Sequence, residues 1–481
     1  MLVARLFSRG SLSPAAKASL WYAICGIVQK CIGVIVVPLY TRIMDPAAYG
    51  TYTVFQSWFT LLFVFTSLGL ANYVFNNGMV RYEDDRDAFT SSMLGLSMAV
   101  TIAFMASFLL FPSFWVDLLG LSAPIVFLLF LRAFVSPSYE LWSARLRYEF
   151  RYKGVVALTL VLTLAVPIVS VPVILLSENK AAAALVCQVV VMTIVYAVPF
   201  ASIMRKSRKL ISKKYWLYAL KFNLPLIPSM FATLALQQLN RIIIAGTVGE
   251  EQAAIFSVAF SVGSVAMFVY SALEQAYRPW FYQGMAKSHD FSVTGAAALV
   301  VVVVGAACGV IALFAPEIMR IFAPAEYWGG MYAVAPIAAS SVLIMLFSVY
   351  ITVEYYFEET LPIPLVSVVT AIINFVLSYL LVPMFGYLSA GYVTLACYLL
   401  LAIGHAFLCR RTARRHLGGR SPVSVLKLFA LAIILVCLII SFQLIYPWLV
   451  IRLLILFVIA IGLLINWKKL LCAFASMKSA K

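Results

Sequence analysis

The chain has 481 residues, of which 64% are hydrophobic and 11% are charged, with a mean hydropathy of +1.02. Soluble globular chains carry about 45–50% apolar and about 25% charged residues, so this composition excludes a soluble fold. The net charge is +17, but the chain offers no soluble domain with a basic face that could bind nucleic acid. Nucleic acid is therefore excluded as a partner.

The apolar runs are about 20–25 residues long, the length that an α-helix needs to cross a bilayer. They do not alternate apolar and polar residues as the strands of a membrane barrel do. We predict an all-α polytopic membrane protein with about 14 transmembrane helices, each placed to within a few residues. In chain order they cover residues 18–39, 51–73, 89–111, 122–143, 154–176, 181–203, 219–240, 253–273, 292–314, 332–352, 362–383, 387–409, 424–443 and 447–466.

The basic residues indicate how these helices are oriented. Twenty-six of the 35 Lys and Arg residues lie in the two terminal segments and in the connections after helices 2, 4, 6, 8 and 12. The opposite connections hold four, namely Arg42, Lys180, Arg241 and Arg320. Because cytoplasmic loops carry the excess of Lys and Arg, we expect both termini of a multi-pass protein to be cytoplasmic.

The connection between helices 1 and 2 reads PLYTRIMDPAAYGTY, residues 38–52. Pro38 is expected to end helix 1, and Asp45-Pro46 to cap and begin helix 2. A weak echo of this turn appears at residues 248–257, which predicts two repeated lobes, as in many secondary transporters. We therefore expect an N-lobe over residues 1–214 (helices 1–6), a C-lobe over 215–415 (helices 7–12), and helices 13–14 with a cytoplasmic tail over 416–481.

Five segments together resemble a known family. They are residues 38–52, 216–249 (WLYALKFNLPLIPSMFATLALQQLNRIIIAGTVG), 274–283 (EQAYRPWFYQ), 315–337 (APEIMRIFAPAEYWGGMYAVAPI) and 373–398 (INFVLSYLLVPMFGYLSAGYVTLACY). Their order and spacing are similar to those of the polysaccharide and O-antigen flippases of the multidrug/oligosaccharidyl-lipid/polysaccharide exporter superfamily. The resemblance covers roughly residues 15–410. Asn240 departs from it, because family members often have an acidic residue there.

The resemblance implies two six-helix lobes around a central cavity. It also implies a flippase that moves an undecaprenyl-pyrophosphate-linked oligosaccharide from the cytoplasmic to the periplasmic leaflet of the bacterial inner membrane, by alternating access. The product would be O-antigen, as part of lipopolysaccharide, or capsule or exopolysaccharide. The implied partners are the lipid-linked oligosaccharide, membrane lipids, a polysaccharide polymerase and a chain-length regulator.

Two cations fall inside predicted spans. Lys30 is near the middle of helix 1 and Arg132 near the middle of helix 4. A cation at that depth costs about 2.5–3.5 kcal/mol on insertion scales, so each should face the interior of the bundle. Arg132 and Glu140 share a polar face of helix 4. One interpretation is an anion-binding cavity. The other is that Lys30 or Arg132 pairs with Glu140 or a carbonyl and only joins helices.

Further substrate-binding candidates lie in the C-lobe. Gln237 continues a polar stripe of helix 7 that leads to Arg241, and Asn374 lies on a similar stripe of helix 11. Such stripes also favour ordinary helix packing. Pro225 and Pro228 should bend helix 7 and are candidates for a hinge.

Enzyme and metal chemistry find little support in the sequence. The eight cysteines form no CxxC pair, and the chain has no GxxxxGK[ST] or HExxH motif. We therefore expect no enzyme activity, no metal and no cofactor, and a H+ or Na+ gradient is the remaining external source of energy. The alternatives are a multidrug exporter of the same superfamily, an unrelated secondary symporter, and a scaffold for polysaccharide enzymes.

The predicted orientation can be tested by thiol labelling in a variant that lacks the native cysteines. A cysteine at Ser212 should resist impermeant reagents in whole cells, whereas one at Ala47 should react, because basic connections stay in the cytoplasm. Labelling of Ser212 with protection of Ala47 would reverse the assigned topology.

Overall fold

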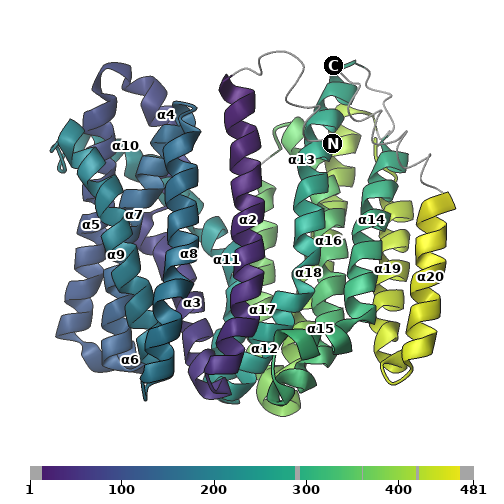
Figure 1. The fold of residues 1–481 in the computed structure, drawn as a ribbon. Coiled ribbons are helices and arrows are strands. Elements are labelled where there is room, and N and C mark those ends of the chain that lie inside the picture. The colour runs from purple at the N-terminus through teal and green to yellow at the C-terminus, as the bar shows by residue number, and fades with distance from the viewer. Residues whose placement is uncertain (1–13, 288–292, 360, 419–421, 466–481) are drawn as a thin grey trace. The chain divides into compact units, whose positions relative to one another are not determined.

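The computed structural model describes residues 14–287, 293–359, 361–418 and 422–465, and every regular element in these ranges is a helix (Figure 1). Eleven helices are long and apolar enough to span a membrane, or up to 12 if a pair bent by 41° forms one span. The all-α membrane class is therefore confirmed, whereas the predicted count of 14 is not.

Two of the predicted spans account for the difference. The second is α3 (Pro46–Ser67), which has 22 residues but is less apolar because tyrosine, threonine, serine and glutamine side chains interrupt it. The last is α20 (Leu449–Ile465), which has 17 residues and is shorter than the spans that qualify. The bent pair is α12 (Glu250–Gly263) and α13 (Ala266–Lys287), where one span was predicted.

The chain divides into two compact units, Met1–Ile227 and Pro228–Lys481. In the described part of unit 1, α7 packs against α9, α5 and α3, and α8 packs against α9 and α2. The elements of unit 1 are α2 (Pro14–Ile43), α3, α4 (Val74–Arg81), η1 (Glu83–Asp85), α5 (Arg86–Leu110), α6 (Pro112–Leu119), α7 (Ala123–Tyr148), α8 (Tyr152–Leu176), α9 (Lys180–Lys206), α10 (Lys213–Asn223) and η2 (Leu224–Leu226).

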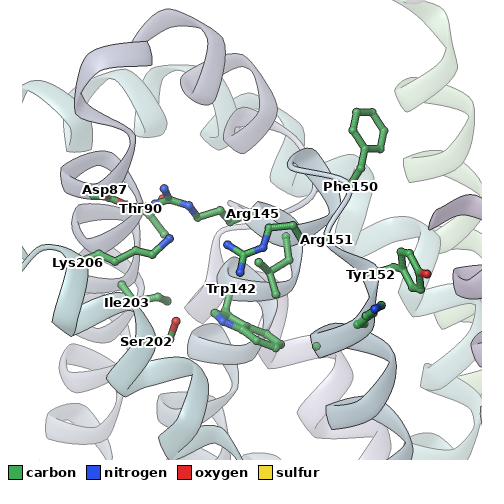
Figure 2. Close-up of a pocket in the computed structure, with 13 residues that line it drawn as sticks. Asp87, Thr90, Trp142, Arg145, Phe150, Arg151, Tyr152, Ser202, Ile203 and Lys206 are labelled. Carbon is green, nitrogen blue, oxygen red and sulfur yellow. Dashed lines mark hydrogen bonds and ion pairs between the residues drawn. The ribbon is translucent and has the colours of Figure 1, made fainter. Parts of the chain in front are cut away.

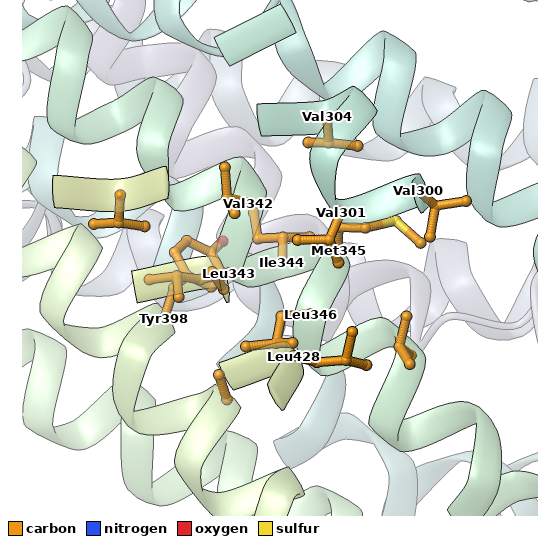
Figure 3. Packing of buried hydrophobic residues seen from close by; sticks show 14 of the residues in the cluster. Val300, Val301, Val304, Val342, Leu343, Ile344, Met345, Leu346, Tyr398 and Leu428 are labelled. Atoms are coloured by element: carbon orange, nitrogen blue, oxygen red, sulfur yellow. The ribbon is translucent and has the colours of Figure 1, made fainter. Parts of the chain in front are cut away.

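Unit 2 is organised around α16, which is buried over 94% of its most apolar stretch. Valines of α14 meet a continuous apolar run of α16, with α18 and α19 on its other sides (Figure 3). The helices of unit 2 are α11 (Ile227–Thr247), α12, α13, α14 (Thr294–Leu313), α15 (Ala315–Phe322), α16 (Met331–Tyr356), α17 (Pro362–Phe385), α18 (Leu388–His416), α19 (Val425–Ser441) and α20, with 3-10 turns η3 (Ala325–Gly330) and η4 (Phe442–Ile445).

The first connection shows one confirmed and one wrong prediction. Asp45 caps α3 as expected, because its side chain accepts a hydrogen bond of 2.9 Å from the Ala48 N–H and Pro46 is the first helical residue. Pro38 does not end the first helix, since α2 continues through it to Ile43. Pro38 lacks an N–H, so the Val34 carbonyl loses its helical partner, and membrane helices tolerate a proline where such a freed carbonyl is satisfied in another way.

Two histidines of α18 repeat one arrangement in unit 2. His405 is 1% exposed, bonds both carboxylate oxygens of Glu354 at 3.0 and 3.1 Å, and stacks on Phe347. His416, three turns further along, lies 3.3 Å from Glu359 and stacks on Phe357 at the exposed end of the helix. Glu354 of α16 reaches His405 of α18 only through tertiary packing, so no local sequence pattern singles out this pair.

The two pairs differ in burial, which makes them a matched test of stability. Glu354→Ala leaves a buried imidazole without its partner, so we expect it to lower the free energy of unfolding by about 3–5 kcal/mol. Glu359→Ala removes an exposed pair and should change stability little. Thermal unfolding of both variants in detergent measures the difference, and equal melting temperatures would show that the buried pair contributes no more than the exposed one.

Candidate functional site

The polar face predicted for helix 4 forms one wall of a cavity in unit 1. α7 contributes Arg132, Ser136, Glu140, Ser143 and Arg147 to this cavity of about 240 Å³. These positions follow the helical spacing, and Arg132 and Arg147 lie about 22 Å apart along the axis at 1.5 Å per residue. The opposite walls come from α3, α9 and the segment after α3, through Phe59, Phe63, Ala71, Asn72, Met192 and Tyr196.

Arg132 is held in this cavity by uncharged groups. It is 8% exposed and donates a 2.6 Å hydrogen bond to Gln56 Oε1, while the Gln56 amide donates to Gln188 Oε1 at 2.7 Å. Its guanidinium lies 3.6 Å from the centroid of the Phe59 ring. Among the described residues it forms no ion pair with Glu140, so the positive charge is positioned but not neutralised by a carboxylate.

Aromatic and hydroxyl groups surround the middle of the cavity. The Tyr139 ring stacks on Tyr196 at 5.1 Å with an interplanar angle of 13°, and its hydroxyl shares a 2.5 Å hydrogen bond with Thr159. Glu140 lies on the same face of α7, between the two arginines along the axis. A flat aromatic surface beside charged and hydroxyl groups can contact both the apolar faces and the hydroxyls of a sugar.

Arg147 was counted in the sequence only as a topological signal. Its guanidinium donates a 2.9 Å hydrogen bond to Ser143 Oγ, which directs it along the polar face of α7. The signal was present, because Arg147 continues the three-to-four-residue spacing of Ser136, Glu140 and Ser143.

Lys30 is not brought together with Arg132 in this cavity. It lies in the middle of α2, its side chain is exposed, and it is absent from the cavity lining. Its assignment to the substrate path therefore stays a prediction from the sequence.

The three candidates of unit 2 take part in helix packing. Arg241 bonds Gln238 at 2.7 Å and lies over the Phe260 ring at 4.4 Å, and Gln237 is half-buried on the same helix. Asn374 is fully buried and donates to Cys397 Sγ at 3.5 Å. This placement favours a structural role for Asn374, while a substrate role for all three stays a prediction.

Asn240, the residue that departs from the family pattern, joins three helices of unit 2. Its amide donates to Thr394 Oγ1 at 2.6 Å and to the Ala390 carbonyl at 3.2 Å, and its oxygen accepts from Ser378 at 2.7 Å. A neutral amide can both donate and accept, so it satisfies this buried network as a carboxylate would not.

The two candidate hinge prolines lie where the chain passes between the units. α10 ends at Asn223, a 3-10 turn contains Pro225, and α11 begins at Ile227 with Pro228 next. The boundary between the two compact units falls between Ile227 and Pro228. The Asn223 side chain donates a 2.8 Å hydrogen bond to the Leu68 carbonyl, which fixes the end of α10 within unit 1.

The support of Arg132 can be tested directly. Gln56→Leu removes the acceptor of a buried guanidinium, so it should lower the free energy of unfolding by about 1.5–3 kcal/mol. Ser136→Ala is the control, because that hydroxyl bonds only the Arg132 carbonyl of its own helix at 2.7 Å. Thermal unfolding in detergent measures both, and a Gln56→Leu protein as stable as Ser136→Ala would show that Arg132 does not depend on this bond.

The fold is similar to those of several membrane transporters of known structure. No curated protein sequence matches the chain significantly. An inward-facing multidrug resistance MATE transporter of the MOP superfamily aligns with a TM-score of 0.61 and 14% identity, covering 82% of this chain and 98% of the other. The lipid II flippase MurJ, in an inward closed conformation, aligns with a TM-score of 0.57 and 11% identity, covering 88% and 98%.

A third structure is a MOP superfamily transporter from Pyrococcus furiosus, for which a reversed polarity of the binding pocket was taken to suggest a different function. It aligns with a TM-score of 0.51 and 14% identity, covering 90% of this chain and 97% of that one. The family described as polysaccharide biosynthesis protein matches residues 15–285. This family and these neighbours comprise transporters and flippases rather than enzymes. The chain therefore belongs to the polysaccharide biosynthesis protein family and has the fold of MOP superfamily transporters.

Proposed function

We propose that this protein is a flippase for an undecaprenyl-pyrophosphate-linked oligosaccharide, which it moves from the cytoplasmic to the periplasmic leaflet of the bacterial inner membrane. The cargo would be a repeat unit of O-antigen, capsule or exopolysaccharide. Support comes from the family match and from the shared fold with a protein described as a lipid II flippase. A polysaccharide polymerase and a chain-length regulator are the partners that would act on the product.

The observation that carries this proposal is the environment of Arg132. A cation inside the bilayer is costly, and here its bonds go to a neutral amide and an aromatic face. Its potential therefore remains available to an anionic ligand, and a guanidinium presents donors in a geometry that fits phosphate oxygens. The pyrophosphate of the cargo is such a ligand.

The remainder of the cavity suits the sugar portion. Tyr139 and Tyr196 offer stacked rings, and Ser136, Ser143 and Glu140 can exchange hydrogen bonds with hydroxyl groups. In this account Glu140 accepts from a sugar hydroxyl, and Arg147 adds positive charge near the other end of the same polar face.

Transport would proceed by alternating access, with units 1 and 2 as the two moving bodies and the break at Pro225 and Pro228 as the hinge. Differential binding of the cargo biases such a motion, and a H+ or Na+ gradient would supply any further energy. Both termini would lie in the cytoplasm.

Multidrug export is the alternative, since several structural neighbours are multidrug transporters. A cavity for cationic drugs would be expected to carry an excess of carboxylates. The lining of this cavity has Arg132 and Arg147 against Glu140 alone, so its charge favours an anionic cargo.

The proposal predicts the phenotype of substitutions at the two intramembrane cations. Arg132→Ala should block export and cause the lipid-linked oligosaccharide to accumulate in the cytoplasmic leaflet, because the anionic head then lacks its compensating charge. Arg132→Lys should retain more activity than Arg132→Ala, and Lys30→Ala should also reduce export. Lipid extraction and mass spectrometry of the intermediate provide the measurement.

In the same assay, a protein with alanine at both Pro225 and Pro228 tests the hinge and should export slowly at normal abundance.

Unimpaired export by Arg132→Ala and Lys30→Ala at normal expression would overturn the assignment of the cavity.

A further inference from the structure

A second and larger cavity lies at the end of unit 1 where α7 and α9 finish and α5 and α8 begin. Its volume is about 520 Å³, within the usual range of ligand sites. Figure 2 shows Lys206 of α9, Arg145 of α7 and Arg151 of the α7–α8 turn directed toward one another across it. We call this cavity the basic vestibule, defined by Asp87, Trp142, Arg145, Arg151, Lys153 and Lys206.

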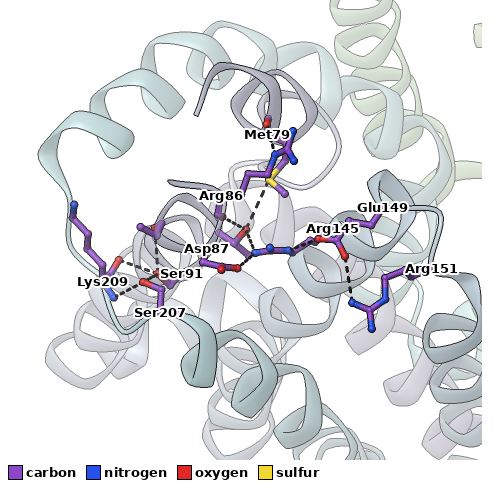
Figure 4. A network of polar contacts seen from close by, with 11 residues as sticks. Met79, Arg86, Asp87, Ser91, Arg145, Glu149, Arg151, Ser207 and Lys209 are labelled. Carbon is purple, nitrogen blue, oxygen red and sulfur yellow. Dashed lines mark hydrogen bonds and ion pairs between the residues drawn. The ribbon is translucent and has the colours of Figure 1, made fainter. Parts of the chain in front are cut away.

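Ion pairs fix one side of the basic vestibule. The Arg145 side chain is 11% exposed and bridges Asp87 of α5 and Glu149, with a distance of 2.8 Å from its Nε to Glu149 Oε1. Arg151 lies 3.5 Å from the other oxygen of Glu149 (Figure 4). These contacts hold the Arg145 guanidinium in place before any ligand arrives.

The charge of this group is not balanced. Lys153 and Lys206 line the same cavity, and within the described residues neither has a carboxylate partner. Arg145, Arg151 and the two lysines therefore face only Asp87 and Glu149. Four cations against two carboxylates leave two positive charges, which matches a ligand that carries about two negative charges, such as a phosphate monoester or a diphosphate.

The turn that presents Arg151 is strained. The Arg151 N–H bonds the Leu146 carbonyl at 2.8 Å and the Phe150 N–H bonds the Arg147 carbonyl at 3.1 Å, which is the Schellman ending of a helix. The left-handed residue of that motif is normally glycine, but here it is Phe150, with φ of 55°. Phe150 borders the cavity and is 52% exposed, and its ring is directed away from the basic side chains (Figure 2).

An aromatic surface completes the basic vestibule. Trp142 of α7 lies opposite Gly154 of α8, where an added Cβ would come within 3.4 Å of the indole. Because Gly154 has no side chain, the space beside that edge of the indole stays free. Aromatic rings beside cations suit a ligand with both a sugar face and a phosphate.

We propose that the basic vestibule binds a phosphate-bearing sugar headgroup and is the site where the diphosphate of the cargo first docks. This inference rests on the proposed function, and on the basic bias that assigns this end of unit 1 to the cytoplasm. It assigns a role to residues outside the cavity of Arg132. Acidic phospholipid headgroups share the phosphate chemistry and are the competing source.

The test is equilibrium binding to the purified full-length protein in nanodiscs of neutral phosphatidylcholine. The probes are inorganic pyrophosphate and geranyl-diphospho-N-acetylglucosamine. Alanine at both Lys153 and Lys206 should weaken binding of each probe by about tenfold or more, because each removes a charged hydrogen-bond donor. Trp142→Leu and Gly154→Leu, which remove or cover the indole, should weaken only the glycosylated probe.

The matched control is alanine at both Arg205 and Lys213, which removes the same charge near the same end of unit 1 from residues outside the cavity lining. We expect this control to bind both probes as the wild type does. An equal loss in the control would mean that binding reflects only the general surface potential and would overturn the proposal, as would unchanged binding when Lys153 and Lys206 are replaced.

A last comparison separates the two sources of phosphate. Adding phosphatidylglycerol to the nanodiscs should leave binding of the glycosylated probe nearly unchanged. If phosphatidylglycerol displaces that probe, the vestibule is a site for bilayer lipid and the docking role is wrong. Because no transport is measured, binding would persist even if the protein were shown not to flip this cargo.

Discussion

Arg132 contacts the Phe59 ring and Gln56, and the rest of unit 1 is arranged around the cost of keeping this cation inside a membrane. Hydrocarbon supplies no hydrogen bonds, so neighbouring helices must provide them, and Gln56 of α3, bonded to Gln188 of α9, does so without adding a negative charge. A carboxylate partner would have stabilised the helices equally well but would have left nothing for an anionic ligand. The use of amides in its place is the feature that favours function over simple helix packing.

In unit 2, by contrast, several buried polar and charged groups are paired with one another. Glu354 is paired with His405, and Arg452 forms two hydrogen bonds with Glu317, which ties α20 to α15. Asn240 joins α11, α17 and α18 through neutral partners. In these contacts the charged and amide side chains find partners within the unit, as expected for a packed scaffold. Although the sequence suggests two repeated lobes, the cationic cavities described here belong to unit 1.

Local sequence patterns predicted several features of the fold and of the candidate site. The polar face of α7 follows from its spacing alone, and the Asp45-Pro46 start of α3 follows from capping chemistry. The partners of Arg132 and His405 could not be predicted in this way. Gln56, Gln188 and Glu354 lie far from them in the sequence and reach them only through tertiary packing. The Pro38 prediction was wrong because membrane helices tolerate internal prolines, so this residue does not by itself mark a helix end. The count of 14 spans was not confirmed, because α3 is too polar and α20 too short to be identified as membrane-spanning helices by length and composition.

Reconstitution of the purified protein in proteoliposomes tests the central claim most directly. A fluorescent undecaprenyl-pyrophosphate-linked oligosaccharide, placed in one leaflet, is followed as it becomes accessible to a quencher in the other. Wild-type protein should accelerate this transfer and Arg132→Ala should not, while neither should move a cationic drug. Transfer of the drug by the wild-type protein, or equal transfer of the lipid-linked oligosaccharide by both proteins, would contradict the account.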